Sequence, residues 1–365
     1  MPLPLGLEIT SQETLRIALD PARNAVASLV LLTHDDEKPG MHEWVSRTKT
    51  AFSTEEMQQH RLVILGMFYA VAPEADWHSF PAYLEHLSSI SPEALQDKLL
   101  NAYARIRREY SWGKGKEKGE IDWDEILSSA EHYIEFLEGT FGKSMVDPEL
   151  EARAYAYVLD PPALKTLILE HLNWVWDEHL KTEWTRVEPM LREAVKAFQT
   201  VDLGSMDRMQ AARFITGQEL DDEKWKIVRE AKQVVFIPNA HIGPYLTRIV
   251  MEDTLAVFFG ARKPEHVSER IPDLDRAELV VRLGALADDT RLRILQMVAE
   301  NGEVRSQEII EVIGLSQPTA SRHLTQLTAT SYLQERREGG AKVYVLNPER
   351  IEATLKALAA FLQLQ

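Results

Sequence analysis

Residues 288–346 combine helix starts, helix stops and apolar positions at spacings that few folds accommodate. Asp288 can cap a helix with one apolar face, and Gly302 ends it. Gly314 supplies a tight turn between two further short helices. The expected helices are 289–299, 307–313 and 317–329, and the expected strands are 333–337 and 342–346. The pattern predicts a helix-turn-helix followed by a two-stranded wing.

The third helix of this pattern has one apolar and one polar face. Ala320, Leu324 and Leu327 recur at helical spacing and are expected in the core. The opposite face suits the DNA major groove, where Arg322 would contact guanine or phosphate, and Gln317 or Gln326 would contact adenine. The predicted DNA-contacting residues are Ser316, Gln317, Thr319, Ser321, Arg322, His323, Thr325 and Gln326, with Arg336, Arg337 and Lys342 on the wing.

Two stretches carry a family resemblance. The run Ala285-Leu-Ala-Asp-Asp-Thr-Arg-Leu-Arg-Ile-Leu295 and the run Leu315-Ser-Gln-Pro-Thr-Ala-Ser-Arg-His-Leu324 are similar to the two most recognisable segments of the arsenical-resistance-repressor (ArsR) family. Residues 275–365 thus resemble that family of winged-helix transcriptional regulators. The resemblance implies a double-stranded DNA operator as partner.

The chain departs from this family at its sensor positions and at two places near the DNA. The family often senses metals through cysteines near the second motif helix, or through histidine and carboxylate ligands on the last helix. This chain has no cysteine, and its last helix has no histidine, so we expect neither metal site. Ser331 stands where the family usually has glycine, and Gly340 and Ala341 replace basic wing-tip residues. Few phosphate contacts and weak non-specific DNA binding are expected.

The last predicted helix, 348–364, shows Ile351, Leu355, Leu358 and Leu362 at helical spacing. It resembles the family's dimer helix, which implies a two-fold homodimer with recognition helices about 34 Å apart. The alternative is that these side chains only cover the core of their own domain.

Charge divides the chain. Residues 275–365 hold 11 Lys or Arg against 12 Asp or Glu, whereas residues 1–274 hold 30 against 45 and contain all eight tryptophans. We therefore expect a domain boundary near 262–274, with an N-terminal domain over 1–265 and a winged-helix domain over 275–365. The predicted class is mainly α with small antiparallel β elements (α+β), and the N-terminal domain is large and helical.

The N-terminal part contains strand-like runs at both its ends. A hairpin is expected from residues 5–9 and 14–19, and further strands at 234–237, 246–251 and 255–259. Antiparallel pairing of these strands with the hairpin would close the domain. Between them helical spacing dominates, with caps at Ser91, Asp122 and Asp160 and breaks that include Pro189.

Candidate ligand residues in this part remain ambiguous. Trp174 and Trp176, with Asn239, His241 and Tyr245, are candidates for the pocket of a small apolar or aromatic effector. Core packing accounts for the tryptophans equally simply, and Asn239 and His241 can instead satisfy turn backbone groups. His34, Asp35, Asp36 and His42 could bind a divalent cation or be plain loop residues. We assign no metal, cofactor or catalytic residue.

These observations predict a cytoplasmic, dimeric DNA-binding regulator, most simply a repressor modulated by an effector in the N-terminal domain. Residues 62–72 form the longest apolar run, which is too short to span a bilayer. The alternatives are an enzyme or protein-interaction module with an accessory DNA tether, and a winged helix that serves only as a protein-binding platform.

Overall fold

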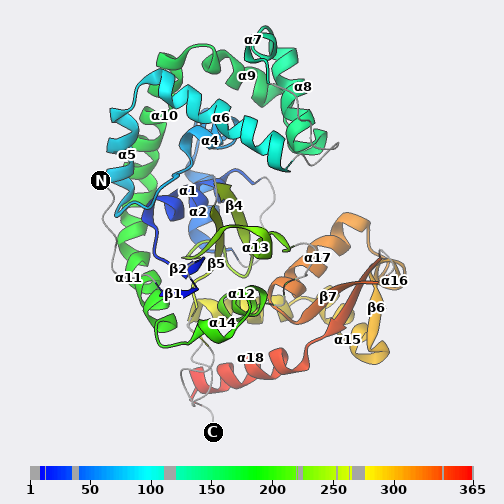
Figure 1. Ribbon diagram of the computed structural model, residues 1–365. Helices are drawn as coiled ribbons and strands as arrows, with labels where there is room; N and C mark the ends of the chain where they lie inside the picture. The colour runs from blue at the N-terminus through cyan, green and yellow to red at the C-terminus, as the bar shows by residue number, and fades with distance from the viewer. Residues whose placement is uncertain are drawn as a thin grey trace. The chain divides into compact units, whose positions relative to one another are not determined.

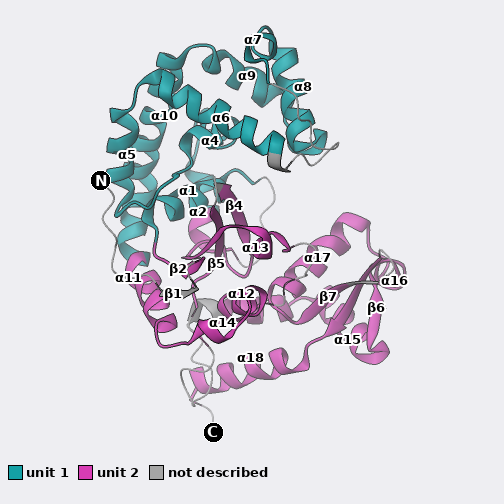
Figure 2. Ribbon diagram, viewed as in Figure 1, with its two compact units in different colours: residues 1–6, 20–35, 46–187 teal, residues 7–19, 36–45, 188–365 magenta. Residues whose placement is uncertain are grey.

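The computed structural model describes residues 9–12, 14–34, 41–110, 121–218, 220, 225–251, 254–262, 264, 276–338 and 341–363 (Figure 1). The chain divides into two compact units (Figure 2). Unit 1 comprises residues 1–6, 20–35 and 46–187, and unit 2 comprises residues 7–19, 36–45 and 188–365. No helix in the described ranges is both long and apolar enough to cross a membrane.

Unit 1 is built from helices, and the predicted caps start them. Asp160 Oδ1 accepts a hydrogen bond from the backbone N–H of Ala163 at 3.1 Å, and Asp122 and Ser91 act in the same way. These caps satisfy N–H groups that a helix start leaves without partners. The elements are α1 (Pro21–Leu32), α2 (Glu43–Ala51), α3 (Thr54–Arg61), α4 (Phe68–Val71), α5 (Phe80–Ser89), α6 (Pro92–Tyr110), α7 (Trp123–Ile126), α8 (Ala130–Phe141), η2 (Lys143–Met145), α9 (Pro148–Val158) and α10 (Pro161–Val175).

Two π-helical segments interrupt the helices of unit 1. The first, η1 (Leu62–Gly66), continues α3, and the second, η3 (Trp176–Leu180), continues α10. Such segments displace backbone groups from the regular α-helical ladder and are frequent at functional sites. The Gly66 carbonyl at the end of η1 accepts a hydrogen bond from the Tyr103 hydroxyl at 3.4 Å.

The predicted break at Pro189 was wrong. Helix α11 (Lys181–Phe198) runs through this proline without ending. A proline inside a helix removes one hydrogen bond. The helix nevertheless buries Val187, Leu191 and Val195 completely or nearly so, and burial of this apolar face outweighs the loss.

The main sheet lies in unit 2 and has the order β1-β2-β3-β5-β4. The hairpin is confirmed, as are the three later strands. Their pairing was predicted wrongly, because β2 pairs with β3, and β3 with β5, in parallel. The central strands β3 and β5 are almost continuously buried, which is typical of parallel pairing. The strands are β1 (Ile9–Gln12), β2 (Leu15–Ile17), β3 (Gln233–Asn239), β4 (Thr247–Met251) and β5 (Thr254–Gly260).

The C-terminal part of unit 2 forms the predicted helix-turn-helix and wing. Around its core, Ile294, Leu324 and Tyr332 are buried, and the third helix packs through the face expected from its spacing. The expected α+β class is confirmed. The remaining elements of unit 2 are η4 (Leu203–Ser205), α12 (Arg208–Thr216), α13 (Ile227–Glu230), α14 (Arg276–Leu286), α15 (Asp289–Asn301), β6 (Glu303–Arg305), α16 (Ser306–Ile313), α17 (Gln317–Ala329), β7 (Leu333–Glu338), β8 (Ala341–Leu346) and α18 (Pro348–Phe361).

Candidate nucleic-acid interface

The turn between α16 and α17 has the geometry that its sequence requires. Gly314 adopts φ 76° in the left-handed region, where glycine avoids the steric penalty of a side chain. Ser316 then caps α17, its Oγ accepting a hydrogen bond from the Thr319 backbone N–H at 3.4 Å. Pro318 occupies the first turn, where the absence of an N–H costs nothing. Sequence-local rules therefore position the start of α17.

The polar face of α17 is mostly accessible. Gln317, Ser321, Arg322 and Thr325 are exposed, and Thr319 is half-buried with its hydroxyl 2.8 Å from that of Ser316. These short polar groups around one arginine present donors and acceptors of the kind that read base edges.

Gln326 does not belong to this accessible face. Its side chain is only 3% exposed, so the prediction that it contacts DNA was wrong. Helical spacing alone placed it at the edge of the polar face, and tertiary packing decided its burial.

His323 is half-buried beside the start of α15. Its Nδ1 lies 3.7 Å from Asp288 Oδ1. Burial lowers the pKa of His323, although Asp288 acts in the opposite direction. A neutral imidazole in this position contributes no positive charge toward a phosphate.

The described cations of the wing are held by neighbouring carboxylates. The Arg336 guanidinium pairs with Glu303 on β6, and Lys342 Nζ lies 2.9 Å from Glu335 Oε1. Arg337 lies opposite Lys342 in the β7–β8 register. These ion pairs reduce the positive charge that the wing offers to a phosphate backbone.

Arg291 has a structural role that sequence reasoning missed. Its Nε donates to the Ala285 carbonyl at 2.7 Å and its Nη2 to the Gly284 carbonyl at 2.8 Å. It therefore satisfies carbonyl groups at the end of α14 from the first turn of α15. Its position three residues after the Asp288 cap was the available signal.

Helices α14 and α18 pack together and leave an apolar surface exposed. The Tyr332 hydroxyl donates to the Arg282 carbonyl of α14 and lies 3.0 Å from the Thr354 hydroxyl of α18. On α18, Ile351 and Leu358 are half-buried, whereas Leu355 and Leu362 are each 53% exposed. Val280 on α14 and Phe361 on α18 are also exposed. The expected dimer residues thus divide between their own domain and its surface.

Comparison with known proteins places this segment. A model of the arsR family of bacterial regulatory proteins matches residues 288–329, from the α15 cap to the end of α17. The arsenical resistance operon repressor of Staphylococcus xylosus is 33% identical over 75 residues, which cover 20% of this chain and 71% of that protein. The chain belongs to the ArsR family. The matched ArsR segment holds both helices of the helix-turn-helix.

Other relatives match the same part of the chain. The arsenic resistance transcriptional regulator ArsR1 of Pseudomonas putida is 42% identical over 76 residues, 20% of this chain and 59% of that protein. This chain thus spans little more than half the length of that ArsR-family relative. A homodimeric winged helix-turn-helix DNA-binding domain from Mycobacterium bovis is 31% identical, covers 25% of this chain and 86% of its own, and has a TM-score of 0.20.

The candidate effector residues of unit 1 contact different neighbours. Trp174 lies 5.2 Å from Phe52 between ring centroids, whereas Trp176 lies 5.3 Å from Phe80. The two rings therefore do not form one stacked wall. Their proposed contact with an effector stays a prediction.

In unit 2 the loop after β3 carries Asn239, His241 and Tyr245, all of them buried. Asn239 Oδ1 accepts hydrogen bonds from the backbone N–H groups of His241 and Ile242 at 2.8 and 2.9 Å. Asn239 therefore satisfies the turn backbone, one of its two expected roles. Gly260 allows this turn to approach β5, because a Cβ there would lie 2.4 Å from the Gly243 carbonyl oxygen.

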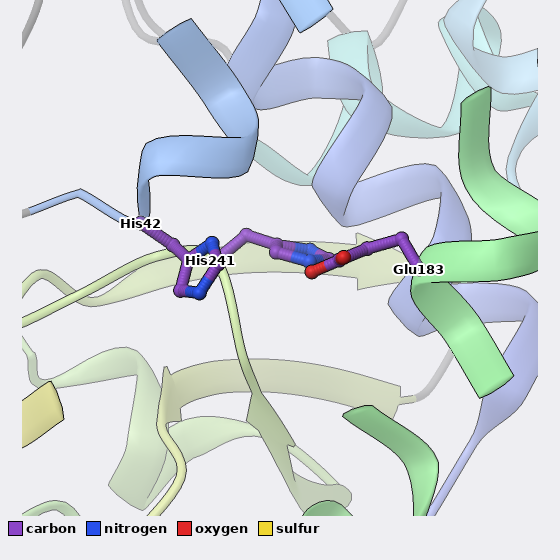
Figure 3. A group of neighbouring side chains, drawn as sticks. All are labelled: His42, Glu183 and His241. Atoms are coloured by element: carbon purple, nitrogen blue, oxygen red, sulfur yellow. The ribbon is translucent and has the colours of Figure 1, made fainter. Parts of the chain in front are cut away.

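His241 lies beside His42 in unit 2, and both side chains are drawn in Figure 3. A ring nitrogen of each lies within 4.8 Å of the other, and the His241 ring stacks on Trp44 at 4.3 Å between centroids. Asp35 and Asp36, the earlier partners expected for His42, lie outside the described residues.

The histidine pair can supply two nitrogen ligands, fewer than the three or four protein ligands of zinc sites. It is therefore an incomplete metal site on its own. Glu183, also drawn in Figure 3, belongs to unit 1, where both carboxylate oxygens accept hydrogen bonds from Arg186 at 2.6 and 3.0 Å.

Proposed function

We propose that this ArsR-family chain is a DNA-binding transcriptional repressor that acts as a two-fold homodimer. The observation that carries the proposal is the exposed face of α17, with Gln317, Ser321 and Arg322 accessible on a helix held by the Ser316 cap and the Gly314 turn. A helix presented in this way fits the major groove, and two copies related by two-fold symmetry read a palindromic operator.

The dimer in this proposal forms through α14 and α18. Leu355, Phe361, Leu362 and Val280 supply exposed apolar side chains on these two packed helices. Burial of such a surface against a second copy removes apolar area from water, which is the main driving force for association. The same patch on both subunits meets itself in a two-fold dimer.

The remainder of the chain, in this proposal, binds a small molecule that changes the DNA affinity of the dimer. A ligand has this effect only if it binds the DNA-competent and DNA-incompetent forms unequally. The chain has no cysteine, so a thiolate metal sensor is excluded.

Selection from random double-stranded DNA tests the proposal, and the enriched sequence is expected to be palindromic. The Arg322→Ala variant should then bind the selected operator about 5- to 150-fold more weakly, as loss of one base-reading arginine costs roughly 1 to 3 kcal/mol. Lys356→Ala removes an exposed cation from α18 and is the matched control. Equal affinities of the two variants would remove Arg322 from the interface, and failure to enrich any sequence would refute operator binding.

A second pair of variants uses one residue type on one helix. Gln317→Ala should relax base preference at one operator position, because Gln317 is exposed at the start of α17. Gln326→Ala should leave base preference unchanged, because its side chain is buried. A changed preference in the second variant alone would contradict the placement of the reading face.

A further inference from the structure

Four helices of unit 1 bring together a cluster of aromatic rings around one acidic side chain. We name it the tyrosine–glutamate cluster, and its members come from α4, α6, α8 and α9, all in unit 1 (Figure 2). Ring centroids lie 5.7 Å apart for Tyr69 and Tyr103, and 6.5 Å apart for Tyr103 and Tyr133. The cluster consists of Tyr69, Tyr103, Tyr133, Phe141, Glu151 and Tyr155.

Two buried polar atoms of this cluster lack hydrogen-bond partners among the described residues. Tyr133 is fully buried, yet its hydroxyl has no partner, and Glu151 Oε2 is buried in the same condition. Other tyrosines of the cluster are satisfied: the Tyr103 hydroxyl donates to the Gly66 carbonyl, and the Tyr155 hydroxyl donates to the Leu127 carbonyl at 2.8 Å. Buried polar groups in native proteins are nearly always paired, so these two atoms call for a ligand.

The fold holds Glu151 in this apolar setting. Gly66 in η1 lies against α9, since a Cβ at Gly66 would come within 3.0 Å of Ala154 Cβ. This close approach carries the adjoining turn of α9, with Glu151, towards the Tyr103 and Tyr133 hydroxyls, and the charge of Glu151 raises the pKa of both. Burial, assisted by the like charge of Asp147, raises the pKa of Glu151 to about 8.

We propose that the tyrosine–glutamate cluster binds an organic monocation with an apolar body, whose charged nitrogen lies between the Glu151 carboxylate and the tyrosine rings. The faces of aromatic rings attract cations, and this attraction strengthens where water is excluded. A buried carboxylate gains most from an opposite charge. Arg105 acts electrostatically on Tyr69, whereas the charge that acts on Glu151 is that of Asp147. An anionic ligand would meet both carboxylates and is disfavoured.

This assignment deepens the proposed function, on which it rests, by naming the chemical class of the effector. The cation ionises Glu151 on binding and releases its proton to solvent. Affinity therefore rises with pH, by up to tenfold per unit while pH is below about 8, and levels off above that value.

Calorimetric titration of the full chain with benzyltrimethylammonium tests the site. The expected result is binding with release of up to one proton at pH 7, detected as a dependence of the heat on the ionisation enthalpy of the buffer. Benzyl alcohol is the neutral control and should bind at least tenfold more weakly. Equal binding of both compounds without proton release would overturn the cation assignment, and so would the absence of binding to the folded protein.

Two variants locate the interaction. Glu151→Gln keeps the shape of the side chain but cannot ionise, so the cation should bind at least tenfold more weakly and independently of pH. Tyr133→Phe removes a hydroxyl without a described partner, so its thermal stability should not fall, while cation affinity should drop severalfold. Wild-type affinity in a folded Glu151→Gln protein would overturn the proposal.

Operator binding is measured separately, with and without benzyltrimethylammonium. Cation binding that changes operator affinity supports the effector role, whereas cation binding that leaves it unchanged keeps the site and overturns that role. If the chain binds the cation but selects no operator, the regulator proposal fails and the ligand site stands.

Discussion

His60 and His171 form a buried pair in unit 1 that should make the stability of the protein fall in mild acid. His60 Nδ1 lies 2.9 Å from His171 Nε2, and His60 Nε2 lies 3.0 Å from the Leu29 carbonyl oxygen. Because a carbonyl only accepts, His60 carries its proton on Nε2 and accepts from His171 Nε2–H. Both rings are therefore neutral in the folded protein.

The magnitude follows from the difference between folded and unfolded pKa values. Burial lowers the pKa of His60 to about 4 and that of His171 to about 3, and both values are about 6.5 in the unfolded chain. Below pH 6.5 the unfolded state takes up protons that the folded pair refuses, so the free energy of unfolding falls as pH falls. Each histidine contributes about 1.4 kcal/mol per pH unit, or roughly 2 kcal/mol at pH 5 and about 4 kcal/mol for the pair.

The assay is urea unfolding at pH 7, 6 and 5, followed by tryptophan fluorescence and circular dichroism. His171→Gln keeps an N–H donor toward His60 and cannot titrate, so its loss of stability between pH 7 and 5 should be about 2 kcal/mol smaller than in the wild type. His132→Gln replaces an exposed histidine and is the control. Equal losses in the wild type and His171→Gln would refute this explanation.

Two further predictions concern the winged-helix part. Ser331 adopts φ 61° after α17, so Ser331→Gly should raise the free energy of unfolding by roughly 0.5 to 1 kcal/mol in thermal or urea unfolding, because glycine bears left-handed geometry without a side-chain clash; a destabilised variant would contradict this. Leu355→Glu should shift the protein toward monomer in light scattering at micromolar concentration, whereas Val312→Glu, at an exposed site on α16, should not. A Leu355→Glu dimer as stable as the wild type would exclude α18 from the interface.

Local rules predicted much of the secondary structure and the position of the candidate interface. Asp160, Asp288 and Ser316 cap helices because a side-chain oxygen reaches an N–H three residues on, an interaction that depends only on neighbouring residues. Gly314 and Ser331 were likewise expected at turns, and both have positive φ. The recognition helix could be found because its caps, its turn and its apolar face are all encoded within thirty residues.

The errors arose where distant residues decided the outcome. Gln326 satisfies the polar spacing of α17, but packing buries it. Pro189 carries the local signal of a helix break, but burial of the α11 face outweighs the lost hydrogen bond. The parallel pairing of β2, β3 and β5 joins strands separated by more than two hundred residues, and antiparallel pairing was the simpler expectation from their spacing.

The sequence by itself determined the helix boundaries, the winged helix-turn-helix and the absence of thiol chemistry, because these depend on residue type and short-range spacing. The tertiary structure alone decided which polar side chains face solvent and which lie buried without partners. His60 and His171 are 111 residues apart, and Glu151 meets Tyr103 and Tyr133 through three different helices. Such neighbours carry no mark in the local pattern, since their contact results from the free energy of packing the whole unit.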